Sequence, residues 1–517
     1  AFILAFIFRA FVVEAFVIPT GSMAPTLLGA HMRFRCPDCG YEFDTNFNVN
    51  SSGSSDDLDI PKTGGRHENI FCPNCGYHLP AAEPTDPAYN PFVRYGDRIL
   101  VLKYLYLLKD PQRWDVVVFK SPDRPDVYDY TQNYIKRLIG KPGESIMILD
   151  GDIYAGPKGA PRDRLQVQTK PREVQESLWR VIHDSDYRPH GVPRINAPAY
   201  REPWTPRSGQ SGWDFGPTNN VAAERVFKFD NLTGSGEIFF NDGANTQQTR
   251  SSTFSDWLAY DSEAGRGSKW NLVGDLKLKF FYDRKTGDGP LRLTLSKRGQ
   301  NFVAEIGKTT ARLLLADGND QPQELIPATE FPSRSGPMSI EFSNADYQVT
   351  VRINDRDVLQ TTPQQYAPDL AALLAGSGAD APAPEVRISA ANQQAALSHI
   401  SLWRDIYYLS DGPRVDVRRN GRLTPEDFRG TADNIMQLND DEFFTLGDNS
   451  QISGDGRYWQ EPTVLPYEGL NVDPGKVPAR FMLGKAFFVY WPAGYRPFES
   501  STVPAVVPNF GDMRFIH

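Results

Sequence analysis

"FVIPTGSMAPTL", residues 16–27, ends the most apolar part of the chain, and the interpretation of the whole sequence depends on its single serine. Ser22 stands between Gly21 and Met23, directly after the apolar segment. A serine in this place is either a turn former or a nucleophile. A nucleophile needs a base, a group that orients the base, and donors for an oxyanion, so the rest of the chain must supply them.

The apolar segment itself, residues 1–18, contains only two charged residues, Arg9 and Glu14. An α-helix of this length extends about 27 Å, which is marginal for crossing a bilayer. A cleavable signal peptide is the alternative, but the basic leader of such a peptide is missing here. We therefore predict an N-terminal membrane helix, and since the sequence does not begin with Met, we expect a partial anchor.

Composition limits the fold and the partners. The chain has 517 residues, 40% hydrophobic and 23% charged, which predicts several globular domains. The 42 Gly and 41 Pro residues favour turns and strands over long helices. The formal net charge of -9 argues against a nucleic-acid partner, because phosphate binding needs clustered Lys and Arg. The predicted fold class is mainly β.

The pattern of the strands changes twice along the chain. Short apolar runs such as "DVVVFK" (115–120) and "ESIMIL" (144–149) are separated by turn signals. From about 170 to 408, runs such as "DLKLKFFYD" (275–283) alternate apolar and polar residues with period two. That alternation is typical of an antiparallel sandwich, which buries one face of each strand. The first character returns from about 409.

Histidines are one possible source of a base for Ser22. His31 and His67 flank the cysteine-containing loops, and His183 and His399 fall near the edges of the alternating region. None of them has a recognisable catalytic context, so a lysine is the other option.

Lys136, in "NYIKRLIGKPGE" (133–144), is the candidate base. On a strand, Tyr134, Lys136 and Leu138 share one face, which presses the ammonium among apolar groups. Its pKa, about 10.4 in water, must fall by roughly 2–3 for it to act near neutrality. Burial supplies such a change, and Arg137 adds a like charge. The alternative is a lysine that extends from a strand edge to solvent.

A third motif, "GDNSQISGDGRYW" (447–459), packs polar and charged residues into one turn-rich segment. By itself it suits a calcium-like loop or a salt-bridged turn. Together and in this order, the motifs resemble those of bacterial type I signal peptidases, which are membrane-anchored Ser/Lys proteases. The resemblance covers the anchor and residues 16–28, 95–155 and 440–492, somewhat under half of the chain.

The resemblance implies a membrane-bound serine endopeptidase that removes signal peptides from exported preproteins after small residues. It places the catalytic domain on the outer, periplasmic side of the bacterial inner membrane. Ser22 matches the nucleophile and Lys136 the general base. Thr20 matches the residue whose hydroxyl forms an oxyanion hole with the Ser22 N–H, and Ser453 the serine that orients the lysine. The other matches are Asp455 and Arg457 as a supporting ion pair, and Ile18, Met23, Tyr134 and Ile135 as substrate-pocket residues.

Two positions depart from the family pattern. The family often has Arg where Ser450 stands and Ser where Gly456 stands. Gly456 removes a secondary hydroxyl but leaves Ser453 in place, so we expect an active dyad.

The four cysteines form two similar turns, "CPDCG" (36–40) and "CPNCG" (72–76). Each turn can present two thiolates to one tetrahedral zinc ion. Two disulfides are the alternative, since an extracytoplasmic domain permits them. We predict a structural zinc ribbon, with His67 or His78 as replacement ligands only in a less favoured arrangement; catalysis needs no cofactor. The predicted ligands are Cys36, Cys39, Cys72 and Cys75.

The alternating region is similar to laminin-G or concanavalin-like jelly rolls. Its aromatic residues can stack on sugar rings, although such residues are more often core. A glycan or protein ligand is therefore a hypothesis, and so is an alternative function in which the chain is a catalytically inactive, membrane-anchored binding protein. A self-cleaving repressor-type Ser/Lys protease is a further rival, which the anchor and the lack of a DNA-binding segment oppose. The tryptophans are Trp204, Trp213, Trp257, Trp270 and Trp403.

These interpretations give a predicted domain organisation of a signal-peptidase-type catalytic β-fold with two insertions. The predicted segments are 1–18, the partial membrane anchor; 19–170, the first half of the catalytic domain; 31–85, the zinc-ribbon insertion; 171–408, the jelly-roll-like antiparallel β-sandwich insertion; and 409–517, the second half of the catalytic domain.

Overall fold

Strands predominate in the computed structural model, so the prediction of a mainly β fold is confirmed. The helices are short: α2 (Leu105–Leu108), α3 (Arg172–Leu178) and α4 (Leu370–Leu374), with 3₁₀ turns η1 (Gly21–Met23), η2 (Arg162–Arg164), η3 (Ala259–Asp261), η7 (Ala479–Phe481) and η8 (Phe510–Asp512). The structure describes residues 13–47, 70–80, 91–123, 130–194, 199–207, 212–215, 225–243, 252–261, 270–316, 322–332, 334, 336–376, 381–410, 427–466, 469–492 and 509–517.

An eight-stranded antiparallel sheet combines strands from both ends of the chain, in the order β1-β4-β28-β5-β6-β24-β27, with β29 on β28. Apolar runs such as that of β5 are buried on both faces, as a central strand requires. Its strands are β1 (Val13–Val17), β4 (Arg98–Leu102), β5 (Val116–Lys120), β6 (Asn133–Gly140), β24 (Glu442–Leu446), β27 (Val477–Pro478), β28 (Met482–Trp491) and β29 (Arg514–Phe515).

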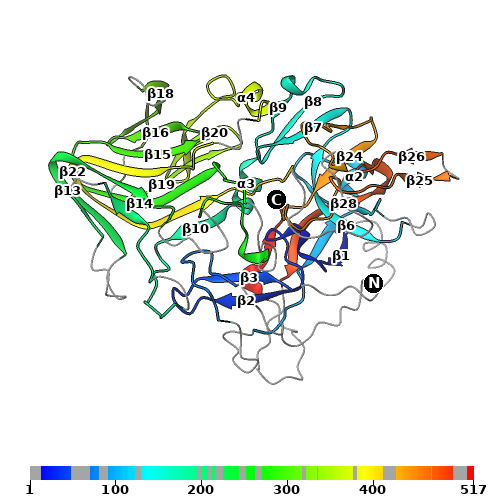
Figure 1. Ribbon diagram of the computed structural model, residues 1–517, viewed down its shortest axis with the longest axis horizontal. Helices are drawn as coiled ribbons and strands as arrows, with labels where there is room; N and C mark the ends of the chain where they lie inside the picture. Colours follow the sequence, from blue (N-terminus) through cyan, green and yellow to red (C-terminus); the bar gives the residue numbers. More distant parts are fainter. Residues whose placement is uncertain are drawn as a thin grey trace.

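Three smaller sheets accompany it, with the β2–β3 hairpin at the bottom of the view in Figure 1. A four-stranded sheet has the order β23-β7-β8-β9, and two hairpins pair β2 with β3 and β25 with β26. The strands are β2 (His31–Arg35), β3 (Glu42–Asn46), β7 (Glu144–Leu149), β8 (Asp152–Pro157), β9 (Gln166–Val167), β23 (Met436–Gln437), β25 (Thr463–Leu465) and β26 (Leu470–Val472).

The strands from 180 to 404 form a separate thirteen-stranded antiparallel sheet. The 19-residue strand β22 links it by pairing with β10, β13, β14 and β15. Trp204 and Trp257 are buried, so these two belong to the core and cannot stack on an external sugar. The strands are β10 (Arg180–Asp184), β11 (Trp204–Pro206), β12 (Trp213–Asp214), β13 (Val226–Phe240), β14 (Leu276–Gly287), β15 (Leu291–Lys297), β16 (Gln300–Ile306), β17 (Thr310–Ala316), β18 (Gln323–Glu330), β19 (Met338–Ala345), β20 (Gln348–Ile353), β21 (Arg356–Gln360) and β22 (Val386–Arg404).

The predicted membrane helix over residues 1–18 is wrong in its last part. Val13–Val17 form strand β1, which pairs with β4 from Val13 opposite Leu102 to Val17 opposite Arg98. Valine and phenylalanine favour a pleated surface, and β4 offers them a free sheet edge. Residues 1–12 lie outside the described residues. Within the described part of the chain, no helix has the length and apolar composition to span a membrane.

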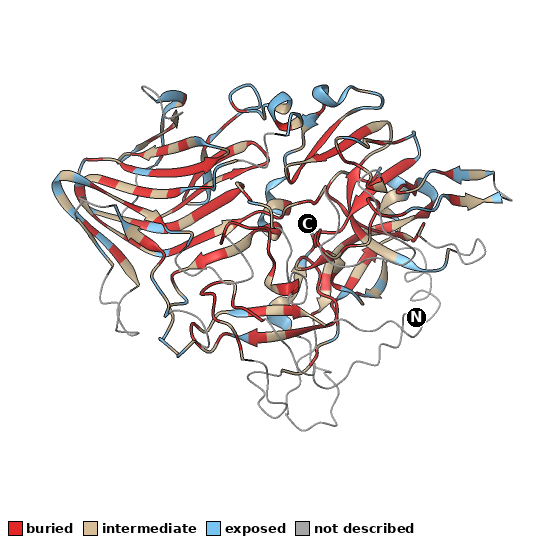
Figure 2. Ribbon diagram, viewed as in Figure 1, coloured by how far each residue is buried: buried red, intermediate tan, exposed pale blue. Residues whose placement is uncertain are grey.

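The thirteen-stranded sheet shares its hydrophobic core with the four-stranded sheet. Met147 of β7 and Tyr154 of β8 are fully buried in the same cluster as residues of β14, β15 and β22, and Figure 2 shows buried positions through both regions. Two buried lysines reinforce this junction. Lys297 of β15 donates to Asp152 of β8 at 3.2 Å and to Asp275. Lys170 bonds Asp346 and, at 2.7 Å, Asp405. Excision of the predicted insertion would expose this core and leave buried charges without partners.

We expect Lys297→Met to lower the free energy of unfolding by about 3–5 kcal/mol, because two buried carboxylates then lose their cation. Lys308→Met, which removes an exposed ion pair with Asp288, is the control and should cost at most about 1 kcal/mol. Urea denaturation of both variants measures the difference. Equal losses would contradict a structural role for the buried junction.

Candidate active site

Ser22 lies in the one-turn η1, directly after β1. The turn is closed by the Ala24 N–H, which donates to Gly21 O at 3.0 Å. Gly21 is required by close packing, since a Cβ there would lie 2.4 Å from the Tyr260 ring. Ser22 is half-buried, so its hydroxyl is held in a fixed turn yet remains partly accessible.

Lys136 of β6 reaches this turn. Its Nζ donates to Ser22 Oγ at 2.7 Å, and the side chain is 5% exposed. β6 is held in place by β5, where Val117 pairs with Lys136, and by β24, where Leu446 pairs with Arg137. The structure therefore brings together the two residues for which the sequence predicts a dyad, and their distance suits proton transfer.

The surroundings of Lys136 lower its pKa to about 8, chiefly through burial. Arg457 lowers it further, whereas Asp455 and Asp448 oppose the change. Arg137, which the sequence predicts to add a like charge beside Lys136, is instead paired with Asp448. The Arg137 guanidinium is fully buried and bonds Asp448 at 2.6 and 2.8 Å, since successive strand residues point to opposite faces.

Ser453 is fully buried, but the predicted hydrogen bond to Lys136 is absent from the structure. Its Oγ has no hydrogen-bond partner among the described residues. Ser453 lies close to the turn that carries Ser22: a Cβ on Gly447 would lie 2.2 Å from Ser453 Oγ and 2.4 Å from Ser22 O. Its role as the lysine-orienting residue thus stays a prediction.

Asp455 and Arg457 form the expected ion pair. The guanidinium donates to both carboxylate oxygens, at 2.8 and 2.7 Å, and both side chains are buried. Asp455 also accepts the Gly447 N–H at 2.9 Å, which fixes the turn beside Ser22. Arg457 donates to Ser450 Oγ at 2.6 Å, so an arginine at 450 would meet a second guanidinium.

The predicted substrate-pocket residues divide between two clusters. Ile18 and Met23 are almost completely buried, and Ile135 packs against the same cluster. Tyr134 packs in a second cluster with Trp459, and its ring centroid lies 5.5 Å from Lys136 Nζ. Thr20, by contrast, is exposed and makes no capping hydrogen bond with its side chain. Ile18 and Met23 therefore present little surface to solvent, and their role as substrate-pocket residues stays a prediction.

Two supporting contacts were not predicted from the sequence. The Asn449 N–H donates to Ser22 O at 3.1 Å, and Asn449 Nδ2 donates to Asp261 Oδ1 at 2.8 Å. Asn449 stands inside the third motif, so its polarity was the available signal. Asp261 belongs to the distant η3, and no sequence pattern connects it with Ser22.

The four cysteine thiols gather into one buried cluster. Four sulfurs bound to a tetrahedral zinc at about 2.3 Å lie roughly 3.7–3.8 Å apart. Here Cys36 and Cys75 are 3.7 Å apart and Cys39 and Cys72 3.6 Å, and all four ligand atoms lie within 4.8 Å. The cysteines are free, so the disulfide alternative is not met. The donor set fits one structural metal ion.

Histidine is not part of this cluster in the described residues. The ring of His78 stacks on Phe71 instead, with centroids 4.4 Å apart, and His67 lies outside the described residues.

The cysteine turns are also bonded to the chain between β10 and β11 of the thirteen-stranded sheet. Asp38 accepts the N–H groups of Gly191 and Val192 at 2.9 and 3.1 Å.

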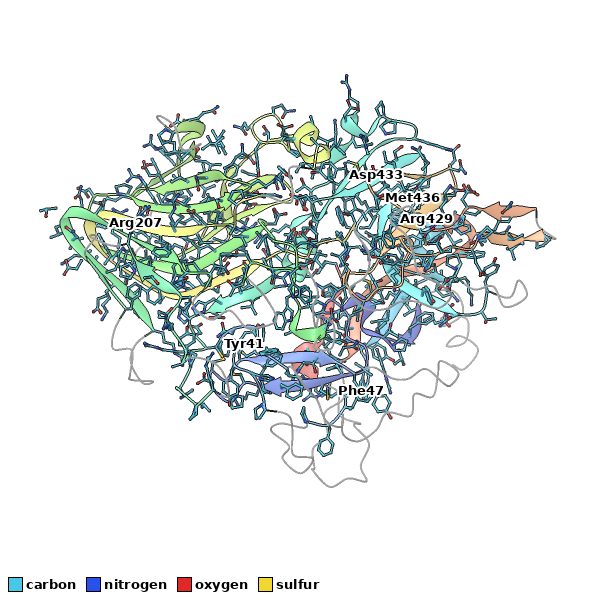
Figure 3. All side chains as sticks on the ribbon, in the orientation of Figure 1. Tyr41, Phe47, Arg207, Arg429, Asp433 and Met436 are labelled. Carbon is cyan, nitrogen blue, oxygen red and sulfur yellow. The ribbon has the colours of Figure 1, made fainter. Side chains whose placement is uncertain are left out.

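The β2–β3 hairpin continues this contact. Tyr41 and Phe47, which flank β3, are labelled in Figure 3, and both pack against the hydrophobic cluster that includes the four cysteines. The Tyr41 ring meets Tyr187 edge-on at 4.9 Å. The hairpin thereby joins the cysteine turns to the chain between β10 and β11.

Residues 86–203 match the family model described as signal peptidase, peptidase S26. The likeness is to signal peptidases. The matched segment contains Lys136, whereas Ser22 precedes it and Ser453 follows it.

Curated relatives extend the same likeness. Probable signal peptidase I-2 of Synechocystis sp. is 34% identical over 99 residues, which is 18% of this chain and 45% of that protein. Probable signal peptidase I-1 of the same organism is 29% identical over 142 residues, 27% and 65% of the two chains. Signal peptidase I of Rickettsia typhi is 26% identical over 159 residues, 31% and 41%. The chain spans about half the length of the curated relatives that it matches.

Two solved structures also align. An endo-β-1,3-glucanase from Pyrococcus furiosus has 8% identity and a TM-score of 0.26, with 51% of this chain and 98% of that chain covered. A carbohydrate-binding module from Bacillus subtilis has 10% identity and a TM-score of 0.22, with 39% and 94% covered.

Packing explains Gly456, one of the two positions that depart from the family pattern. A Cβ there would lie 2.5 Å from Gly475 O and 2.8 Å from the Phe444 ring. We expect Gly456→Ser to destabilise the fold by about 1–3 kcal/mol. Gly511→Ser, where the nearest atom is 3.8 Å away, is the control. Thermal unfolding compares them, and an unchanged midpoint for Gly456→Ser would contradict the packing argument.

Proposed function

We propose that this chain is a membrane-bound serine endopeptidase that removes signal peptides from exported preproteins after small residues, with Ser22 as nucleophile and Lys136 as general base. One observation carries the proposal: a buried lysine, with a pKa lowered to about 8, donates to Ser22 Oγ at 2.7 Å. The match of residues 86–203 to the signal peptidase family supports the same activity.

In the proposed reaction, Ser22 Oγ attacks the scissile carbonyl while Lys136 Nζ accepts the hydroxyl proton. The tetrahedral intermediate collapses when the amine leaves with that proton, and an ester on Ser22 remains. Water then attacks the ester, again with Lys136 as base, and releases the second product. The Ser22 N–H and the Thr20 hydroxyl would stabilise the oxyanion.

The geometry of β6 supports binding of an extended substrate. β6 pairs with β5 along Asn133–Arg137, but with β24 only from Arg137 onward. Among the described strands, β24 therefore does not extend beside Ile135 and Lys136. A peptide that pairs with this edge of β6 brings its carbonyl to Ser22 by β-strand addition. Ile18 and Met23, which are buried in the nearby apolar cluster, are the residues proposed to contact the small side chains of the substrate.

Exposed apolar residues support the membrane part of the proposal. Leu107 and Leu108 of α2 are 83% and 80% exposed, and α2 contacts β28. Phe515, 65% exposed, lies on β29, which pairs with the same strand. Both elements thus lie against β28, and exposed apolar side chains suit contact with a membrane surface. We propose that this surface faces the bacterial inner membrane from its periplasmic side.

Cleavage of a preprotein by the detergent-solubilised protein tests the proposal. Ser22→Ala should lower kcat by at least about 10³-fold, and Lys136→Arg should do the same because a guanidinium keeps its proton at working pH. Lys120→Arg, in the neighbouring strand, is the control and should keep activity. Equal product from Ser22→Ala and the unaltered protein would exclude the proposed nucleophile.

The pH profile tests the base separately. Lys136 must be neutral to accept a proton, so activity should be low below its pKa and rise with pH through an ionisation near 8. The rate should then stay high until the fold fails. Initial rates at saturating substrate from pH 6 to about 10 measure this. A rate that falls over that interval would contradict a lysine base.

We further propose that the cysteine cluster binds one structural zinc ion, because its thiol spacing suits tetrahedral coordination. Elemental analysis should find one zinc per chain. Titration after unfolding in chelator should find four thiols, whereas two disulfides would give none. Cys36→Ser should lower the unfolding temperature clearly, whereas kcat of the folded protein should change little. A protein with four thiols and no bound metal would overturn the zinc assignment.

A further inference from the structure

One segment of the thirteen-stranded region, Ser252–Asp261, packs directly on the turn that carries the nucleophile. Leu258 and Tyr260 form a buried cluster with Ala24 and Leu28, which follow Ser22. The Tyr260 ring also occupies the space above Gly21, where a Cβ would lie 2.4 Å from it. The turn therefore has a packing partner outside the two segments that carry the Ser/Lys motifs.

A chain of two hydrogen bonds leads from the same segment to Ser22. Asp261 Oδ1 accepts from Asn449 Nδ2 at 2.8 Å, and the Asn449 backbone N–H donates to Ser22 O at 3.1 Å. Asp261 is 3% exposed and Asn449 fully buried, so solvent cannot replace either bond. Loss of a buried partner in such a chain leaves the next group unsatisfied.

The atoms left over in this pair complement one another. Asp261 Oδ2 and Asn449 Oδ1 are both buried without a partner in the described part of the chain. Two acceptor oxygens cannot bond, but a protonated carboxyl supplies the missing hydrogen and pairs with the amide through two bonds. Burial raises the pKa of Asp261 to about 7, while the Asn449 bond opposes the change, so the protonated form is populated near neutrality.

We propose that Asp261 is a positioning residue for Ser22: it orients the Asn449 amide, and Asn449 in turn holds the Ser22 carbonyl oxygen through its backbone N–H. The inference rests on the proposed role of Ser22 as nucleophile. The inserted region thus contributes to the orientation of the attacking group, although none of its described side chains bonds Ser22 Oγ or Lys136 Nζ.

Kinetics of preprotein cleavage test this. Asp261→Ala should lower kcat about 10-fold or more with little change in KM, because the attacking oxygen shifts while the substrate-binding edge of β6 is untouched. Asp261→Asn keeps a two-bond amide pair and should keep kcat within about twofold. Asp256→Ala, in the same segment, is the structural control, since it lacks a bond to Asn449. Full kcat in Asp261→Ala, or equal loss in Asp261→Ala and Asp261→Asn, would overturn the inference.

A double-mutant cycle separates this inference from the proposed activity. Asp261→Ala, Asn449→Ala and the double variant are unfolded in urea, and the two single losses should add to more than the loss in the double variant. Strict additivity would overturn the pairing even in a protein without protease activity. Conversely, a protein in which Ser22→Ala has no effect loses the proposed function while the pairing stands.

Discussion

The burial of Lys136 beside Ser22 is the constraint on which the arrangement of the site depends. Lowering the pKa of a lysine from 10.5 to about 8 corresponds to destabilising its charged ammonium form, relative to the neutral amine, by about 3 kcal/mol. The fold must keep other charges near Lys136 from cancelling this effect. It does so by pairing them with one another: Arg137 with Asp448 and Arg457 with Asp455. Because the neighbouring charges are paired with one another, Lys136 is the group among them that can lose its charge.

Close backbone approach is the second requirement, and glycine meets it. The turn after β24 reaches Ser22 and Ser453 through Gly447, where a side chain has no room. Gly456 is similarly enclosed by Gly475 and Phe444. These contacts bring the third motif against the first, while β6 brings in the second. Three segments far apart in sequence therefore converge without bulky side chains between them.

The sequence predicted those features of the structure that depend on short spacing between residues or on the order of the motifs. The two CPxCG turns predicted gathered thiols, and motif order predicted that Ser22 and Lys136 meet. The end of the apolar N-terminal segment was misjudged because a continuous apolar run fits a helix or a buried strand equally well, and only the free edge of β4 decides for Val13–Val17. The core shared by Tyr154 and the insertion, and the Asp261–Asn449 bond, join residues distant in sequence, which local periodicity cannot reveal.

The two ends of the thirteen-stranded region lie side by side, which explains how it can reach Ser22 without disturbing the other sheets. β10, near its start, pairs with β22, near its end, with Arg180 opposite Arg404, so the chain leaves and returns at one place. Such closure lets the intervening residues form their own sheet at little cost to the strands outside it. From there the segment Ser252–Asp261 extends to the turn that carries Ser22. The backbone N–H groups of residues 190–192 donate to Asp38, which lies in the first cysteine turn. The same sheet also carries the buried Lys297, which donates to Asp152 of β8. A region fastened at these points supports the turn that carries Ser22, the proposed nucleophile.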